Sequence, residues 1–418
     1  MAKGGGLTRR TLLGHAAALG VGAGLGYAGG ELNGDNGSSE SAASESERVE
    51  FYGPHQAGIA TLAQEFLSFA TFDLSTDSAD DLRSLLLEWT AAAAAITQGK
   101  LYQPDPQRSH LPPDDPAESA GLGPQRLTLT FGFGPSLFGV GGEDRFGFGQ
   151  RRPAKLSRLP VFSGDVLEDQ RSDGDLCVQA CAENPQVAFH AIHVLARAAN
   201  GVATLRWSQD GFGRTSSTSR EQPTPRNLMG FKDGTNNIRA EDSEALEEHV
   251  WVQPGDGADW MAGGTYLVAR RIKMLFDVWD ATSLEGQEAA IGRAKDSGAP
   301  LGQGGEFDNV DLGARTGGQP VIPEDAHVRL SSPESNGGKR ILRRGYSFSE
   351  PSPPGSGEID AGLFFISFQR SPEQFAAIQR RLSGLDALNR HLLNTASALF
   401  ACPPGVKPGG FVGEGLFA

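Results

Sequence analysis

Residues 66–96 read FLSFATFDLSTDSADDLRSLLLEWTAAAAAI, a strand pattern followed at once by a helix pattern. The segment Phe66–Leu74 is apolar and rich in phenylalanine, as in a buried strand. Ser75–Ser78 offers capping side chains, and between Asp81 and Ile96 the leucines and Trp89 recur at helical spacing. The stretch therefore predicts a strand followed by an amphipathic helix.

The same rhythm continues through both halves of the chain. In the first half we predict strands at Arg126–Phe133, Asp175–Ala182 and Val202–Gln209, and a helix at Pro185–Ala199. In the second half we predict strands at Tyr266–Val278, Lys339–Phe348, Gly362–Arg370 and Ala396–Cys402, and helices opening at Thr282 and Ser371. Each half then has the β-α-β-β-α-β order of a ferredoxin-like unit.

A sheet with helices on one face must bury its other face, and two such sheets can bury each other. We therefore predict an α+β fold of two ferredoxin-like halves packed sheet to sheet, of the dimeric α+β barrel type. The predicted domains are residues 48–222 and residues 223–418, and the second contains the candidate site residues Asp233, His327 and Arg343.

The N-terminus reads as a targeting segment. Arg9 and Arg10 precede a mild stretch rich in alanine and glycine, Leu12 to Tyr27, which resembles a twin-arginine (Tat) export signal. From Gly29 the chain is rich in Gly, Ser and Glu, as in a disordered linker. Residues 1–47 are thus predicted to be signal peptide and linker, and the protein is expected in the cell envelope, the periplasm or outside the cell.

Composition narrows the functional classes. The 418 residues carry 38% hydrophobic and 21% charged residues, as in a soluble globular protein, and the formal net charge is −14. So acidic a chain is not expected to bind nucleic acid. Cys177 and Cys181 would lie roughly 13 Å apart on one strand, too far for a disulfide, so they and Cys402 are predicted to be buried thiols.

Three segments offer residues for chemistry, each with a simpler alternative. Gly230–Asn237 brackets Asp233 with glycines, which suits either close approach to a ligand or a tight turn with a solvated acid. His327 stands among polar neighbours, as a ligand or a surface histidine would. Arg343 lies on the opposite strand face from Arg344, so one of them needs an inward partner unless the strand is a solvated basic edge.

A metal site is weakly indicated elsewhere. His190 and His193 stand three residues apart on the predicted helix Pro185–Ala199, but no third ligand is evident near them in the sequence. The chain also lacks a phosphate-binding loop, zinc-ligand spacing and a Gly-x-Ser-x-Gly elbow.

Taken together, eight segments resemble the dye-decolorizing peroxidase family, in its Tat-exported deferrochelatase/peroxidase subgroup. The resemblance covers nearly all of the chain after the linker. The segments are Phe51–Ile59, Leu159–Phe162, Gly174–Leu176, Gly230–Gly234, Trp260–Val268, Ser297–Gly302, Asp325–Leu330 and Leu342–Ser347.

The resemblance implies a cofactor and roles for named residues. It implies one non-covalent haem b per chain with His327 as the axial iron ligand, and the chain has no Cys-x-x-Cys-His motif for covalent attachment. Asp233 and Arg343 would be the distal catalytic pair, and Arg343 would also contact haem. Gly234, Thr235 and Asn236 would line it. After the histidine, relatives tend to have Asn-Pro-Arg where this chain has Ser332-Pro333-Glu334.

The implied activity is reduction of hydrogen peroxide through a ferryl intermediate, with oxidation of dyes, phenols or other donors. The alternative is a deferrochelatase, which would release iron from haem, leave the porphyrin intact and work with membrane components of an iron-uptake system. A haem carrier or sensor without catalysis would need neither Asp233 nor Arg343. A homo-oligomer is compatible with the resemblance.

Overall fold

The computed structural model describes residues 47–103, 112–352 and 354–418, so the predicted signal peptide lies outside the described residues. The first half has the predicted order. Its elements are β1 (Phe66–Leu74), α2 (Ala79–Ile96), β2 (Thr128–Phe133), β3 (Leu176–Ala182), α3 (Pro185–Ala198) and β4 (Ala203–Arg214). The Ser78 side chain accepts a hydrogen bond from the Asp81 amide and so caps α2, as the sequence indicated.

The second half repeats this order with additions. Its main elements are β5 (Thr265–Met274), α5 (Phe276–Asp280), α6 (Leu284–Ile291), β8 (Leu342–Arg343), β9 (Tyr346–Glu350), β10 (Asp360–Gln369), α8 (Pro372–Leu385) and β11 (Leu392–Cys402). Two short helices, α4 (Ser243–His249) and α7 (His327–Ser331), and a small hairpin, β6 (Arg315–Thr316) with β7 (Gln319–Pro320), lie in the connections. The predicted boundary between residues 222 and 223 falls between β4 and α4 and stays a prediction.

Two predicted strands were wrong in part. The strand predicted at Tyr266–Val278 ends at Met274, because the chain turns into α5 and Trp279 packs edge-on against Phe231, with ring centroids 5.9 Å apart. The strand predicted at Lys339–Phe348 is broken between Arg343 and Tyr346. Gly345, which precedes Tyr346, packs so tightly that a Cβ on it would lie 2.8 Å from Thr215 Oγ1.

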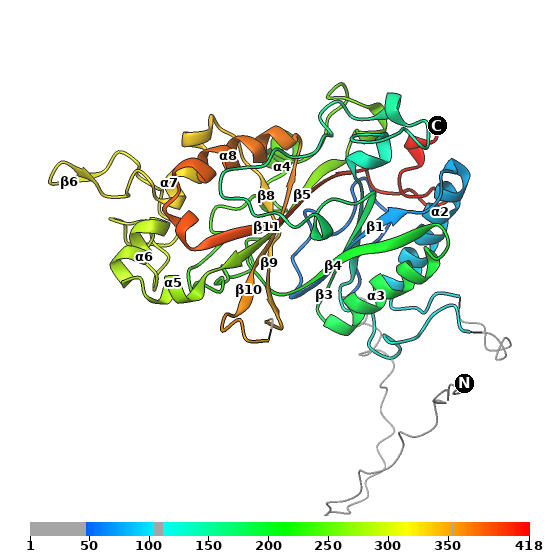
Figure 1. Cartoon of the computed structure of the whole chain (residues 1–418), viewed down its shortest axis with the longest axis horizontal. Coiled ribbons are helices and arrows are strands. Elements are labelled where there is room, and N and C mark those ends of the chain that lie inside the picture. The colour runs from blue at the N-terminus through cyan, green and yellow to red at the C-terminus, as the bar shows by residue number, and fades with distance from the viewer. Residues whose placement is uncertain (1–46, 104–111, 353) are drawn as a thin grey trace, which may run out of the picture. The chain divides into compact units, whose positions relative to one another are not determined.

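All the strands except β6 and β7 form one closed antiparallel sheet, and most of them are labelled in Figure 1. Their order is β5-β11-β2-β3-β1-β4-β9-β10-β8, and β5 also pairs with β10. The two halves meet where β4 pairs with β9 and where β11 pairs with β2. The sheets of the two ferredoxin-like halves therefore close on each other like a barrel, which confirms the predicted fold.

Alternate residues of each strand enter two different cores. On β1, Phe69 packs inside the barrel with Phe364 and Phe400, at centroid distances of 5.3 and 6.3 Å. Its neighbour Phe72 points outward and contacts Trp89 of α2. The helices α2 and α3 thus cover the outer face of the first half, on the right in Figure 1.

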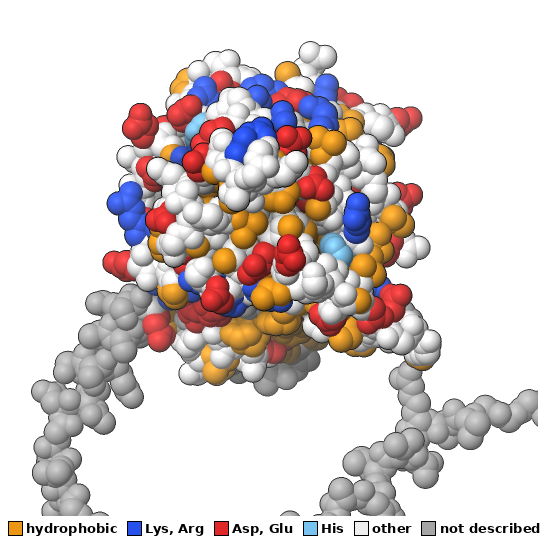
Figure 2. All heavy atoms as spheres, turned by 90° about the vertical axis from the view of Figure 1, so that its left-hand side faces the viewer, with side chains coloured by type: hydrophobic (Ala, Val, Ile, Leu, Met, Phe, Trp, Pro, Cys, Tyr) orange, Lys and Arg blue, Asp and Glu red, His pale blue; other side chains and the backbone are white. Residues whose placement is uncertain are grey.

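The burial of the three cysteines and the mixed character of the surface agree with what the composition indicated. All three cysteines are free and buried, as predicted, and burial raises the pKa of each thiol. Acidic and basic side chains are interspersed with apolar ones on the face seen in Figure 2. Within the described ranges, no helix is both long and apolar enough to cross a membrane.

Candidate functional site

His327 is the first residue of α7, and a buried carboxylate holds its ring. Asp386 Oδ2 lies 2.6 Å from His327 Nδ1. The other oxygen of Asp386 accepts the Leu388 amide at 2.9 Å, and the Ala387 amide donates to the Asp325 carbonyl at 3.0 Å. These bonds tie the start of α7 to the turn after α8, so the orientation of the imidazole is fixed by both segments.

A glycine allows α7 to pack this closely. Gly292 ends α6 in the left-handed conformation, with φ of 87°. A Cβ on Gly292 would overlap Val328 Cγ1 and would lie 3.2 Å from Ala326 Cβ, on the two residues that flank His327. Only glycine fits between α6 and the histidine segment without moving one of them.

The free edge of the imidazole is accessible. The His327 side chain keeps 36% of its surface exposed, against 4% for Asp386, which covers Nδ1. Among the described residues, no hydrogen bond reaches Nε2. Desolvation lowers the pKa of His327. The charge of Asp386 and its hydrogen bond with the ring together raise this pKa by more than desolvation lowers it, and the charge of Asp233 adds a smaller increase, so the net shift is upward.

Asp233 is presented by a loop that needs a glycine next to it. Gly234 has φ of 87°, and a Cβ on it would lie 2.7 Å from Ser216 Cα, so the loop requires glycine here. The Asp233 amide donates to the Pro225 carbonyl at 2.9 Å, and its Oδ2 accepts from Asn227 Nδ2 at 3.2 Å. The acid is therefore held by its backbone and its side chain, which is not what a freely solvated turn would show.

Arg343 meets this acid from β8. Its Nη1 donates to Asp233 Oδ1 at 2.7 Å, although the two residues stand 110 positions apart. Asn237 fixes the backbone of Arg343, because its side chain bonds to both the amide and the carbonyl, each at 2.8 Å. Ser216 Oγ also donates to the Arg343 carbonyl at 3.0 Å. The alternative of a solvated basic edge does not describe this strand.

Arg344 takes the inward position on the opposite face. It is 1% exposed and donates to the backbone carbonyls of Thr61 and Leu62 and to the Gln64 side chain. Of the two arginines, Arg344 thus has a structural role, and Arg343 is the one that meets an acid.

Asp233 and Arg343 lie close enough to His327 to interact with it electrostatically. Asp233 raises the pKa of His327 and Arg343 lowers it, so the charges of all three residues interact. In the Asp233 loop, Thr235 is buried and donates to Glu306 Oε1 at 3.3 Å, whereas Asn236 is exposed. The segment Ser332-Pro333-Glu334 bonds locally, with Ser332 Oγ donating to the Arg329 carbonyl.

Sequence reasoning missed two residues of this site. Asp386 was not singled out, although an acid at the C-terminal end of the predicted helix that opens at Ser371 opposes the helix dipole and so invites another explanation. Asn237 was quoted within its segment but was given no role. The sequence signal for Asn237 was the pair of asparagines, Asn236 and Asn237, two residues after Gly234.

Comparison with known proteins decides the family. The family models for the N-terminal and C-terminal parts of Dyp-type peroxidases match residues 56–213 and 224–407. The chain belongs to the Dyp-type peroxidase family. It is thus a haem-dependent peroxidase, an enzyme that consumes peroxide and an electron donor.

Among relatives, this Dyp-type peroxidase is 38% identical to the dye-decolorizing peroxidase of Thermobifida fusca (strain YX), over 98% of this chain and 96% of that one. It is 35% identical to the deferrochelatase of Escherichia coli (strain K12), over 86% and 85% of the two chains.

Solved structures agree. Ferric DtpA from Streptomyces lividans superimposes with a TM-score of 0.81 at 37% identity, covering 89% of this chain and 98% of that one. A DyP-type peroxidase from Cellulomonas bogoriensis gives 0.79 at 38%, covering 88% and 98%. A DypB variant from Rhodococcus jostii in complex with heme is 21% identical and supports the fold alone, with a TM-score of 0.59 and coverage of 83% and 95%.

The residues at this site fit a haem. A histidine whose Nδ1 donates to a carboxylate keeps the lone pair on Nε2, and this is the arrangement in which protein histidines bind metals. His327 has that arrangement with Asp386, and its free edge is accessible. The nearby pair of Asp233 and Arg343 offers an acid and a fixed positive charge, which peroxide cleavage needs and haem storage does not.

Proposed function

We propose that His327 binds the iron of one non-covalent haem b per chain, and that Asp233 and Arg343 act on hydrogen peroxide. Gly234, Thr235 and Asn236 are proposed to line the cofactor. One observation carries the proposal. The 2.7 Å contact of Arg343 Nη1 with Asp233 Oδ1 joins residues that stand 110 positions apart, within electrostatic reach of His327.

The bound haem supplies the redox chemistry, and the chain handles the proton and the charge. The two oxygens of Asp233 have different partners, because Oδ1 accepts from Arg343 at 2.7 Å and Oδ2 from Asn227 at 3.2 Å. The more weakly bonded Oδ2 is the atom we assign to take a proton from one peroxide oxygen and deliver it to the other. Arg343 carries fixed positive charge that stabilises negative charge on the leaving oxygen.

The test replaces each member of the pair. Asp233→Ala keeps the positive charge and removes the proton carrier, whereas Arg343→Leu keeps the carrier and removes the charge. General acid–base groups contribute about 10² to 10⁴ in rate, and a fixed electrostatic donor about 10² to 10³. We expect Arg343→Leu to slow the reaction with peroxide at least as much as Asp233→Ala, in stopped-flow mixing followed at the Soret band. Wild-type rates in both haem-loaded variants would remove both residues from the peroxide site.

Iron release from haem is the second candidate function, supported by the 35% identity to proteins named deferrochelatase. Incubation with haem under two conditions separates the two functions. Turnover of a donor with peroxide supports the peroxidase, and metal-free protoporphyrin in excess over enzyme, formed with a reductant, supports iron release. Membrane components of an iron-uptake system would be partners only in the second case. The elution volume of the haem-loaded protein in gel filtration tests the homo-oligomer.

We also propose export by the twin-arginine route, on the evidence of Arg9 and Arg10 before a mildly apolar stretch. Replacing both residues with lysine should leave the haem-loaded precursor inside the cell. Export of the double variant at the wild-type level would exclude this route.

A further inference from the structure

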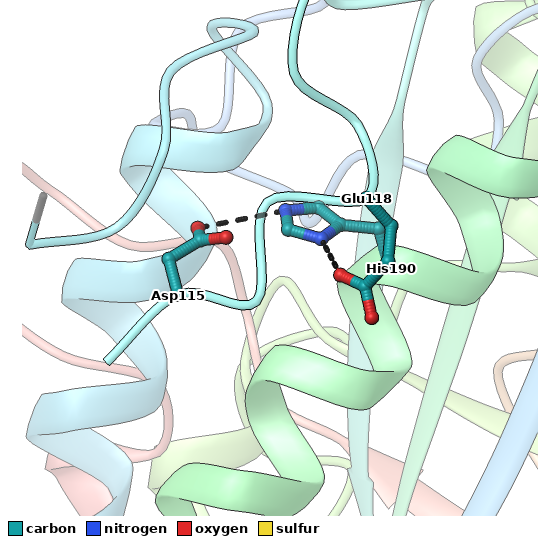
Figure 3. A group of neighbouring side chains, drawn as sticks. All are labelled: Asp115, Glu118 and His190. Carbon is teal, nitrogen blue, oxygen red and sulfur yellow. Dashed lines mark hydrogen bonds and ion pairs between the residues drawn. The ribbon is translucent and has the colours of Figure 1, made fainter. Parts of the chain in front are cut away.

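A second candidate site lies on α3 and the loop that precedes β2 in the chain. Asp115, Glu118 and His190 offer one ligand atom each, and these atoms lie within 4.8 Å of one another. Figure 3 shows the imidazole of His190 between the two carboxylates, with one ring nitrogen turned to each. We call these three residues the α3 site. In Figure 1, α3 and α7 lie at opposite sides of the drawing, so the α3 site is separate from the haem site.

One nitrogen of His190 is satisfied and the other is not. Glu118 Oε2 lies 2.8 Å from Nδ1, as expected for an N–H that donates to a carboxylate. His193 Nδ1 lies 2.5 Å from the other oxygen, so both oxygens of Glu118 are engaged by histidines. His190 Nε2 is buried with no hydrogen-bond partner, and the residue is 0% exposed.

The unpartnered nitrogen points at a second carboxylate. His190 Nε2 lies 3.6 Å from Asp115 Oδ2, beyond the distance of a hydrogen bond. With the proton on Nδ1, the Nε2 lone pair and a carboxylate oxygen face each other inside the protein, and this contact is favourable only with a second proton or a metal cation between them. Two ligand atoms bound at about 2.1 Å to one tetrahedral metal ion lie about 3.4 Å apart, close to the separation seen here.

The surroundings hold Asp115 in place and are acidic. Asp115 is 5% exposed, its Oδ2 accepts the Tyr102 amide at 2.7 Å, and its Oδ1 accepts the Ala117 amide at 2.6 Å. Asp114 directly precedes Asp115 in the same loop and adds a further carboxylate to it. A cation entering this region gains from several negative charges that are already positioned.

We propose that the α3 site binds a divalent metal ion of the zinc or manganese type, which accepts mixed nitrogen and oxygen ligands. His190 Nε2 and Asp115 Oδ2 bind the ion, and water completes its coordination. Glu118 holds the ring through Nδ1, in the carboxylate–histidine–metal arrangement that fixes the tautomer. The ion would join α3 to the loop that contains Asp115, and this role is independent of the peroxidase reaction.

The test uses the full haem-loaded protein, freed of metal with a chelator and titrated with Zn²⁺ and then with Mn²⁺ in a calorimeter. We expect one binding event that Asp115→Asn and His190→Gln abolish. Glu118→Gln should weaken it by about 10- to 100-fold, as loss of an outer carboxylate does. His193→Gln is the matched control, because His193 also bonds to Glu118, on its other oxygen, and should leave the affinity close to wild type.

Folding is checked separately, so that a damaged variant is not mistaken for a lost ligand. Asp115→Asn keeps the size of the side chain, and its Soret and far-ultraviolet spectra should match those of wild type. Zn²⁺ should raise the Tm of wild type and of His193→Gln but not that of Asp115→Asn. A wild-type protein that binds neither ion, or an Asp115→Asn protein that binds as wild type does, would overturn the proposal.

Discussion

Asn237 bonds to both backbone groups of Arg343, accepting from its amide and donating to its carbonyl, each at 2.8 Å. The same Nδ2 also donates to the Ser217 carbonyl at 3.1 Å. Asn237 belongs to the loop that carries Asp233, so one side chain sets the position of the arginine relative to the acid. It is a positioning residue, since it acts through Arg343.

Asn237→Ala should therefore impair both stability and the reaction with peroxide. The Arg343 amide would lose the Asn237 side chain as its acceptor, and a backbone group left unsatisfied costs about 1–3 kcal/mol, which urea unfolding would measure. The Soret response to peroxide should slow as well, because Arg343 loses the side chain that fixes its backbone. An Asn237→Ala protein that reacts at the wild-type rate would mean that Arg343 is held without it.

Replacing Asp386 should loosen haem. The carboxylate fixes the tautomer and the orientation of His327, and loss of such an outer partner typically costs about 10- to 100-fold in metal affinity. We expect faster haem transfer to an excess scavenger from Asp386→Ala, and a changed axial-ligand spectrum from His327→Ala. Asp386→Asn should fall between wild type and Asp386→Ala. An unchanged spectrum in His327→Ala would rule out His327 as the ligand.

Gly292→Ala should disturb the histidine segment from outside the site. Gly255→Ala is the control that separates backbone strain from steric overlap, because the two glycines have nearly equal φ, 87° at Gly292 and 89° at Gly255. A methyl group on Gly255 meets nothing within 4 Å, so Gly255→Ala reports backbone strain alone, about 1–2 kcal/mol. Gly292→Ala adds the overlap with Val328 and should lose more stability and more haem. Equal losses of stability and of haem in the two variants would show that α7 moves to accommodate the methyl group at no further cost.

The ion pair of Asp256 and Arg370 should make stability depend on pH. Arg370 Nε and Nη2 donate to the two carboxylate oxygens at 2.5 and 2.9 Å, and these bonds hold the pKa of Asp256 below its usual 3.8. A carboxylate with a lowered folded-state pKa contributes stability above pH 3.8 and loses it as the pH falls through the folded value. Asp256→Asn should thus be less stable than wild type at pH 7. The difference should shrink in acid, and a gap that does not change with pH would contradict this.

The elements with one clear period were predictable from sequence. Phe66–Leu74 was predicted residue for residue, because a run of apolar residues bounded by capping residues allows only one interpretation. The structure from Met274 to Trp279 was not predicted correctly, since the apolar residues of this stretch fit a strand or a helix equally well. The end of β5 at Met274 depends on the contact of Trp279 with Phe231, which no local sequence pattern contains.

The site was predictable only in part, and for a similar reason. Asp233, His327 and Arg343 stand in distinctive segments, and the structure brings the first and the last into contact. The partner of the histidine, Asp386, is 59 positions away from it and looks like an ordinary helix end in sequence. The acidic partners of His190 were likewise distant, because Asp115 and Glu118 reach it from a loop more than 70 residues earlier.

The two junctions between the halves also have a dynamic consequence. Ala401 is the residue of β11 that pairs with Phe133 of β2, and β4 pairs with β9 only at its last residues, Phe212 and Arg214. Amide protons at these short junctions should exchange with solvent before those between β1 and β3, whose pairing runs the whole length of β3. Tyr346, at the second junction, follows Arg343 by three residues, so amide exchange there would report how firmly the segment of the arginine is held.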